Sequence, residues 1–200
     1  MDPLNAGIGP SPRSRSVGRA LGACALAAVV SILPVDQSRA QSEDQASEYR
    51  VKAAFLYKFG SYVEWPDGAF AREDSPVAIG VIGADALAEE LAQIVAGRSV
   101  NGRPVSVRRL RAGDPPVGLQ VLFIGREHAG RLAEILASVK GRPLLTVTES
   151  DQALDLGSVI NFVVVDDKVR FDVALVPAEL GNLKISARLL AVARKVVKPS

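Results

Sequence analysis

The chain has 200 residues, of which 24 are Lys or Arg and 22 are Asp or Glu, so its formal net charge is +2. The first 40 residues hold four of the basic residues and two of the acidic ones, which leaves 20 of each sign in the rest. Because the remainder is formally neutral, the basic character belongs to the N-terminus, and nucleic acid is not expected as a partner.

The N-terminal residues have the pattern of a cleavable secretory signal peptide. A basic region that ends at Arg19 precedes an apolar stretch at residues 20–33, and small residues stand at Ser38 and Ala40. This order predicts cleavage after Ala40 and export. The apolar stretch is shorter than the roughly 20 residues that span a bilayer, which makes a membrane anchor the lesser alternative. Lipidation at Cys24 is a second alternative, although most of the apolar stretch lies after this Cys.

Cleavage would divide the chain into a signal peptide, residues 1–40, and one domain, residues 41–200. The single Cys of the chain is Cys24, so the exported domain would have no disulfide, no thiolate nucleophile and no Cys-based metal site. About 160 residues suffice for one domain that buries roughly 70% of the surface its unfolded chain exposes. Its stability is therefore expected to come from packing.

The segment after the signal peptide is rich in aromatic residues and predicts an amphipathic helix. Ser42 or Ser47 can cap its N-terminus, and Pro66 is expected to end it. Apolar residues recur at four- and three-residue spacing and are expected to form a stripe that faces the core. The members of this stripe are Val51, Phe55, Phe59 and Tyr62.

Two further aromatic residues of this segment are candidates for contact with a partner protein. Tyr57 projects nearly opposite to the apolar stripe, and Trp65 stands at the exit of the predicted helix. Exposed aromatic side chains are often anchors of protein interfaces. A helix that lies between a sheet and another element buries two faces, so a core position is the alternative. We predict Tyr57, Trp65 and Lys184 as partner-binding residues.

Strands and helices alternate in the rest of the chain. Helical spacing predicts helices at residues 85–96 and 128–139, and a final helix that carries Ile185, Leu189, Leu190 and Val196. Apolar runs and alternation predict strands at residues 77–82, 104–110, 119–124, 144–148, 159–165 and 169–175. The pattern predicts an α/β fold, a layered single domain with a mixed sheet of about six strands flanked by helices, and a C-terminal antiparallel hairpin plus helix. The hairpin would turn at Asp166-Asp167-Lys168.

No catalytic set is apparent in the sequence of the domain. His128 is the one His of the chain, and no Cys of the domain can complete a zinc site with it. A hydrolase that uses His128 with a Ser and an acid is an alternative. Gly80 and Gly83 lie where a strand turns into a helix, but the full Gly-x-Gly-x-x-Gly spacing is missing. We expect no catalytic residue, no metal and no cofactor, with a ligand cleft at the strand ends near Gly83 and Gly125 as the alternative.

Six segments that cover most of the chain from about residue 49 onward form an ordered pattern. The segments are VKAAFLYKFGSYVEWP, IGVIGADALAEEL, VNGRPVSVRRL, VLFIG with RLAEILASVKGRPLLTVTES, GSVINFVVVDDKVRFDVAL and LKISARLLAVARKV. In this order they resemble the YfiR-like family of periplasmic regulatory proteins.

The resemblance implies a periplasmic regulator without enzyme activity. Members of the family bind the periplasmic sensor domain of an inner-membrane diguanylate cyclase, hold the cyclase inactive, and are themselves sequestered by an outer-membrane lipoprotein. This chain would then lower cyclic-di-GMP output, a signal for biofilm formation, and it is expected to be a homodimer. An accessory protein of a sensor histidine kinase and a small-molecule-binding periplasmic sensor are the alternatives.

Four positions depart from the family pattern. Gly80 and Gln120 stand where family members often have Cys, so a redox-active disulfide cannot be carried over to this chain. Lys58 and Ala174 replace the usual Asn residues of the first helix and the last strand. Contacts that depend on those two amides are therefore not expected here.

Overall fold

The computed structural model describes residues 36–111 and 113–199, with side chains from residue 43 onward. The predicted signal peptide lies outside the described residues except for the backbone from Asp36, where the first helix begins. The helices are α1 (Asp36–Phe59), α2 (Asp85–Val95), the 3-10 helix η1 (Arg126–Arg131), α3 (Leu132–Val139), α4 (Leu175–Leu180) and α5 (Ala187–Val192). The strands are β1 (Val63–Glu64), β2 (Val77–Ile82), β3 (Ser99–Val100), β4 (Arg103–Leu110), β5 (Val121–Ile124), β6 (Leu145–Thr148), β7 (Ile160–Val165), β8 (Lys168–Ala174), β9 (Lys184–Ile185) and β10 (Lys195–Val197).

Eight of these strands form one mixed sheet in the order β10-β8-β7-β6-β5-β2-β4-β3. Four neighbouring pairs are parallel: β4–β2, β2–β5, β5–β6 and β6–β7. The pairs β7–β8 and β3–β4 are antiparallel. Strands β1 and β9 form a separate antiparallel pair. The predicted α/β fold with a mixed sheet is confirmed, and the short edge strands β3 and β10 extend the sheet beyond the six strands expected.

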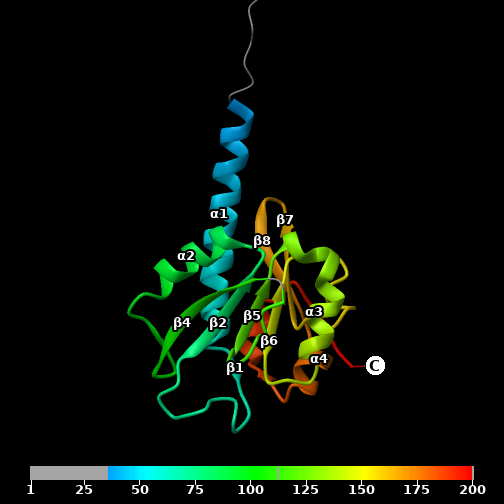
Figure 1. Ribbon diagram of the computed structural model, residues 1–200. Coiled ribbons are helices and arrows are strands. Elements are labelled where there is room, and N and C mark those ends of the chain that lie inside the picture. Colours follow the sequence, from blue (N-terminus) through cyan, green and yellow to red (C-terminus); the bar gives the residue numbers. More distant parts are fainter. Residues whose placement is uncertain (1–35, 112, 200) are drawn as a thin grey trace, which may run out of the picture. The chain divides into compact units, whose positions relative to one another are not determined.

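Helices cover both faces of the sheet, so that two cores form (Figure 1). Helices α1 and α2 pack on one face, where Leu56, Leu87 and Phe123 are fully buried. Helix α3 packs on the other face through Leu132 and Leu136. Because both faces are covered, the central strands are continuous apolar runs rather than alternating ones.

Helix α1 differs from its prediction at both ends and in its buried stripe. It begins at Asp36 rather than at a Ser42 or Ser47 cap, and it ends at Phe59 rather than at Pro66. The residues that α1 buries against the domain are Tyr49, Lys52, Ala53, Leu56 and Phe59. Of the predicted stripe, Phe59 is buried and Phe55 half-buried, but Val51 is 41% exposed and Tyr62 lies beyond the helix. The true stripe is thus rotated by about one residue, or 100°.

The predicted final helix is wrong in its extent, because the C-terminal segment is divided into three short elements, of which only α5 is helical. Lys184 and Ile185 form β9, which pairs with β1 through the register Val63↔Ile185 and Glu64↔Lys184. Helix α5 is only six residues long, and Ser186 caps it by accepting a hydrogen bond from the backbone N–H of Arg188. Strand β10 then adds to the edge of the sheet beside β8.

The predicted hairpin is confirmed, with a two-residue turn between β7 and β8. Val165 pairs with Lys168, and both Asp166 and Asp167 adopt positive φ, 49° and 55°. Two consecutive residues of this kind make the type I′ turn whose twist matches that of a hairpin, and Asp tolerates this conformation. The pair of carboxylates is therefore explained by the turn.

The loops that follow β2 and β5 touch each other at two glycines. Gly83 has φ +68°, and the side chain of His128 lies against it. A Cβ atom at Gly125 would lie 2.1 Å from the carbonyl oxygen of Gly83. This contact closes the space directly between the two loops, so any cleft at these strand ends lies beside the two glycines and not between them.

We expect the substitution Gly125→Ala to lower the free energy of unfolding by about 3 kcal/mol, because the new methyl group would meet backbone that cannot move independently. The control is Gly130→Ala, since a Cβ atom at Gly130 meets nothing within 4 Å. The control should change the free energy of unfolding by less than about 1 kcal/mol. Urea denaturation of the two variants measures the difference, and equal values would contradict the contact.

Candidate functional site

Tyr57 is a half-buried residue of α1 that contacts the edge of the sheet. Its hydroxyl group lies 3.1 Å from the carbonyl oxygen of Ser99 in β3 and donates a hydrogen bond to it. The guanidinium of Arg98 and the ammonium of Lys58 lie 5.6 Å and 5.7 Å from the centre of its ring. These contacts give Tyr57 a structural role at the β3 edge, while its partner-binding role stays a prediction.

Trp65 and Lys184 line one cavity of about 540 Å³ beside the β1–β9 pair. The other charged residues of its lining are all acidic: Glu64, Asp67 and Glu179. The ring of Trp65 packs edge-on against Phe70, with the centres 6.1 Å apart, and its indole nitrogen is buried without a hydrogen-bond partner among the described residues. The structure therefore brings together two of the three predicted residues, and Tyr57 is not part of this lining.

His128 lies within η1 and shows no geometry of a catalytic base. Both ring nitrogens are buried, and neither forms a hydrogen bond with any residue in the described part of the chain. Its imidazole packs against Gly83 instead. Within the described residues no nucleophile is within hydrogen-bond distance of the His128 ring nitrogens.

A larger cleft of about 840 Å³ opens where β5 and β6 end. The loop after β5 supplies Arg126 to its lining, the loop after β6 supplies Glu149 to Gln152, and α1 supplies Lys52. Residues 161–165 of β7 form a further wall. The cleft therefore adjoins Gly125 through Arg126 and extends toward β6 and β7, whereas Gly83 is not part of its lining. It lies at the carboxyl ends of parallel strands, where α/β sheets commonly bind ligands.

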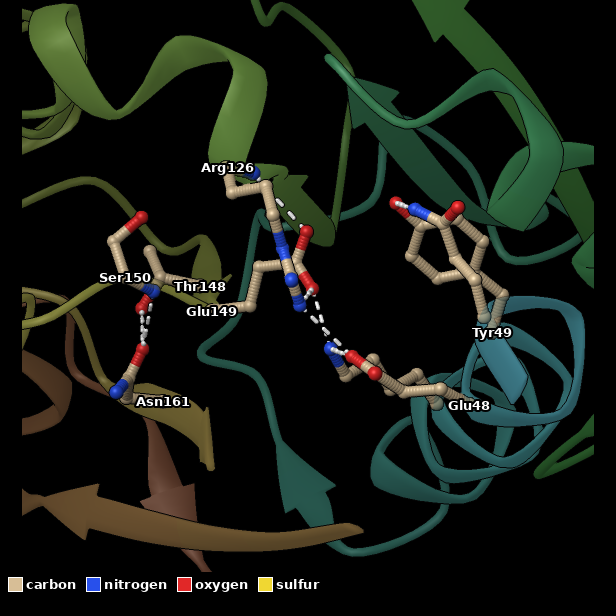
Figure 2. Close-up of polar contacts among 9 residues, drawn as sticks. Glu48, Tyr49, Arg126, Thr148, Glu149, Ser150 and Asn161 are labelled. Atoms are coloured by element: carbon tan, nitrogen blue, oxygen red, sulfur yellow. Dashed lines mark hydrogen bonds and ion pairs between the residues drawn. The ribbon is translucent and has the colours of Figure 1, made fainter. Parts of the chain in front are cut away.

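A cluster of four charged side chains lies at the base of this cleft (Figure 2). We call it the ionic cluster; its members are Glu48, Lys52, Arg126 and Glu149. The ammonium of Lys52 donates to the carboxylates of Glu48 and Glu149, and the side chains of Lys52 and Glu149 are each only 1% exposed. Arg126 Nη2 lies 2.8 Å from Glu48 Oε1 and 3.2 Å from Glu149 Oε2. The two positive charges and the two negative charges of the ionic cluster give it a formal net charge of zero.

The loop after β6 holds Glu149 in this position. Oγ1 of Thr148 donates to Oδ1 of Asn161 over 2.8 Å, and the backbone N–H of Ser150 donates to the same oxygen over 3.1 Å. The backbone N–H of Arg126 donates to Glu149 Oε1 over 3.0 Å. Glu149 therefore stands between two residues fixed by Asn161 and is tied to the start of η1 as well.

The ionic cluster shifts the protonation equilibria of the groups around it. Burial alone would lower the pKa of Arg126, but the charge of Glu149 and the hydrogen bond to it outweigh burial, so the pKa lies above its ordinary value. Burial, together with the negative charge of Glu149, raises the pKa of the Tyr49 phenol. Both effects keep these side chains in the same protonation state across the physiological pH range.

Sequence reasoning did not identify the ionic cluster, although one signal for it is present. Lys52 lies on the same helical face as Tyr49, Leu56 and Phe59, at spacings of three, four and seven residues. A charged residue on a buried stripe needs a partner of opposite charge. The partner Glu149 lies 97 residues further along the chain, and only the fold brings the two together.

The substitution Lys52→Met is expected to lower the free energy of unfolding by about 3–5 kcal/mol, because it leaves the buried Glu149 carboxylate without its main counter-ion. The double variant Lys52→Met/Glu149→Met should recover part of this loss, since no unpaired charge then stays buried. As a control, Arg72→Met removes an ion pair whose two side chains are more than three-quarters exposed, and it should cost less than about 1 kcal/mol. Denaturant unfolding of the three variants gives the comparison. A loss for Lys52→Met no larger than that for Arg72→Met would refute the role assigned to Lys52.

Residues 36–111 and 113–199 contain no helix with the length and apolar character of a membrane span. Within the same residues no group of three or more His, Asp or Glu side chains is arranged to hold a metal ion.

Comparison with known proteins identifies the family of the chain. Among solved structures, it is similar to a conserved domain protein from Vibrio cholerae O1 biovar El Tor, with 11% identity and a TM-score of 0.48. The similarity covers 60% of this chain and 54% of that protein, so the chain spans about half the length of that protein. The profile of the YfiR/HmsC-like family, which is a regulatory and non-catalytic family, matches residues 49–194. The chain therefore belongs to the YfiR/HmsC-like family.

Proposed function

We propose that this protein is a periplasmic regulator that represses a membrane-bound diguanylate cyclase by binding the periplasmic sensor domain of the cyclase. The observation that carries the proposal is the family match, which extends from Tyr49 in α1 to Arg194 just before β10. The predicted signal peptide supports the periplasmic location. In this proposal the protein acts by binding alone and needs no cofactor.

The cavity beside β1 and β9 supports a binding role. It combines the aromatic ring of Trp65 with the charges of Lys184 and three acidic residues, and a half-buried aromatic beside a charged rim is typical of interface anchors. Repression requires that the protein prefer the inactive conformation of the receptor. Moving an equilibrium from mostly active to mostly inactive takes about 5.5 kcal/mol of differential affinity, which one protein interface can supply.

We expect the Lys184→Glu variant to capture the periplasmic domain of its cyclase at least tenfold less well than the unchanged protein, because it reverses the one positive charge of the cavity. Trp65→Ala should also weaken capture. Co-purification with the tagged periplasmic domain measures the capture by each variant. The concentration of cyclic-di-GMP in cells that carry either variant should rise in parallel. The control is Lys140→Glu, which reverses an exposed charge outside this cavity.

Three results would count against the repressor proposal or correct it. Undiminished capture by folded Lys184→Glu and Trp65→Ala variants would rule out this cavity as the contact. Unchanged cyclic-di-GMP after deletion of the gene would rule out repression of a cyclase. Capture of the periplasmic domain of a sensor histidine kinase, with no capture of a cyclase, would replace the cyclase as the partner.

A second candidate function is a periplasmic sensor of a small molecule, and the cleft at the ends of β5 and β6 favours it. Its volume of about 840 Å³ is within the range of pockets that hold metabolites. The guanidinium of Arg126, about half of whose surface is exposed, is one of the charged groups that a ligand would meet there, together with Asp151 and Arg194. Such a sensor would share the fold and the compartment of the repressor.

A ligand of this cleft should raise the melting temperature of the protein, because binding to the folded state alone stabilises it by about 2.7 kcal/mol at 100 times the dissociation constant. The measurement is a thermal-shift screen of amino acids, sugars and dicarboxylates. A true ligand should lose its effect on Arg126→Gln but keep it on Arg131→Gln, a control whose guanidinium is similarly exposed. A screen in which no compound acts in this way would argue against a sensor.

A further inference from the structure

A cavity of about 440 Å³ lies between α3 and α4, at the edge of the sheet where β6 and β7 begin. Figure 1 shows these two helices next to each other. Helix α3 lines the cavity with Leu136 and Val139, α4 lines it with Val176 and Leu180, and the loop before β7 contributes Leu156. The cavity shares only Leu156 with the cleft at the strand ends and no residue with the cavity beside β1 and β9. It is therefore a separate site of the domain.

Three large aliphatic side chains of this cavity are exposed to solvent. Leu180 is 50% exposed, Leu156 is 44% exposed and Val176 is 43% exposed. Val176 and Leu180 are four residues apart on α4 and therefore lie on the same face of the helix. The wall that α3 supplies, Leu136 and Val139, belongs to the buried core beneath them. Exposed apolar side chains that gather in one cavity are typical of a site that binds a ligand or a partner.

Positive charge is concentrated at one end of this apolar cavity. Lys140 and Arg142 stand two residues apart in the turn after α3, and neither forms an ion pair with any residue that the structure describes. Arg142 Nη2 donates to the carbonyl oxygen of Pro116 over 3.1 Å, and the other guanidinium nitrogens have no partner among the described residues. Asp155 is the acidic residue of the lining, so two positive charges stand against one negative charge.

We propose that this cavity binds a fatty-acid-type ligand, a single acyl chain that ends in a carboxylate. The chain covers Leu156, Val176 and Leu180, which removes their apolar surface from water. The carboxylate accepts hydrogen bonds from the free guanidinium nitrogens of Arg142, whose planar geometry suits a carboxylate. The volume of about 440 Å³ is within the range of pockets that hold small ligands. This ligand site depends neither on repression of a cyclase nor on the cleft at the strand ends.

The separation of apolar and charged groups in this cavity is the reason for choosing an acyl chain with one carboxylate. The buried polar side chain of the lining, Thr146, already accepts a hydrogen bond from the backbone N–H of Val159 over 3.0 Å. A sugar or a dicarboxylate would bury hydroxyl or carboxylate groups against the aliphatic walls without partners, which is costly. An acyl chain has no such groups, and its carboxylate is complementary to the positive end of the cavity.

The test is isothermal titration calorimetry of the purified protein with hexanoate, octanoate, decanoate and dodecanoate, each below the concentration at which it forms micelles. Each methylene group that enters the cavity should lower the dissociation constant about fourfold. This gain should stop at the chain length that fills the cavity. Decylammonium has the chain length of decanoate and the opposite charge, so it should bind at least tenfold more weakly than decanoate.

Variants of the lining locate the binding site. Val176→Glu and Leu180→Glu place a carboxylate among the exposed aliphatic side chains, and each should weaken the binding of decanoate at least tenfold. Arg142→Gln should abolish the preference for decanoate over decylammonium. The matched control is Val192→Glu, because Val192 is 64% exposed and does not line this cavity. The control should bind decanoate like the unchanged protein, and circular dichroism checks that each variant is folded.

Three outcomes would overturn the fatty-acid site: no binding of any of the four fatty acids, equal binding of decanoate and decylammonium, or undiminished binding of decanoate by the folded Val176→Glu and Leu180→Glu variants. The second outcome would leave the cavity as an apolar contact surface for another protein. None of these measurements involves the cyclase, and the Arg126→Gln variant of the cleft should bind decanoate like the unchanged protein. Failure of the fatty-acid site is therefore separate from failure of the repressor or the sensor function.

Discussion

The pairing of one buried ammonium with two carboxylates is the interaction on which the packing of α1 against the sheet depends. Lys52 is almost fully buried on α1, and it joins Glu48 of the same helix to Glu149 at the end of β6. Burying these charges is costly, and only complete pairing with good geometry offsets the desolvation. Apolar packing tolerates small rotations of a helix, but the ionic cluster does not, since each displacement would separate buried charges. The ionic cluster thus fixes the rotation of α1 relative to the sheet.

The fixed rotation of α1 determines which of its side chains are exposed to solvent. Glu48 belongs to the ionic cluster, and it also lines a groove between α1 and the β7–β8 hairpin. One side chain therefore joins the ionic cluster to this groove. Arg126 closes the cluster on its other side and lines the cleft at the strand ends. A change in the cleft that draws Arg126 away from Glu48 would leave Lys52 as the only cation paired with that carboxylate. The cleft at the strand ends and the exposed side of α1 are therefore joined by one network of charged side chains.

Local sequence patterns are sufficient for the six longer strands of the sheet but not for the elements whose form depends on distant partners. The apolar run of β2 and the Asp166-Asp167 turn carry their own signals, and both were predicted. Ile185 is predicted to lie in a helix, because the strand β9 that it forms exists only through pairing with β1, more than 100 residues earlier. Phe55, Phe59, Phe162 and Phe171 form one aromatic group, with ring centres 5.1–6.0 Å apart, which selects the buried face of α1. The periodicity of α1 alone cannot show where those partner rings lie.

Gly80 and Gln120, where the resemblance to the family implies Cys in many members, show how this Cys-free domain is held together without a covalent link. Gln120 precedes β5; its Oε1 accepts the backbone N–H of Ala78 over 2.9 Å, and its Nε2 donates to the carbonyl oxygen of Ala69 over 2.9 Å. At Gly80 a Cβ atom would lie 2.5 Å from the side chain of Leu119, which occupies the space above the glycine. Two contacts are involved: the hydrogen bonds of the buried Gln120 amide and the packing of Leu119 over Gly80. Each contributes about 1–3 kcal/mol to the free energy of unfolding. Their sum is comparable to the 2–5 kcal/mol that a native disulfide typically contributes. Because neither contact responds to oxidation, the strand pair β2–β5 keeps its geometry whatever the redox state of the surroundings.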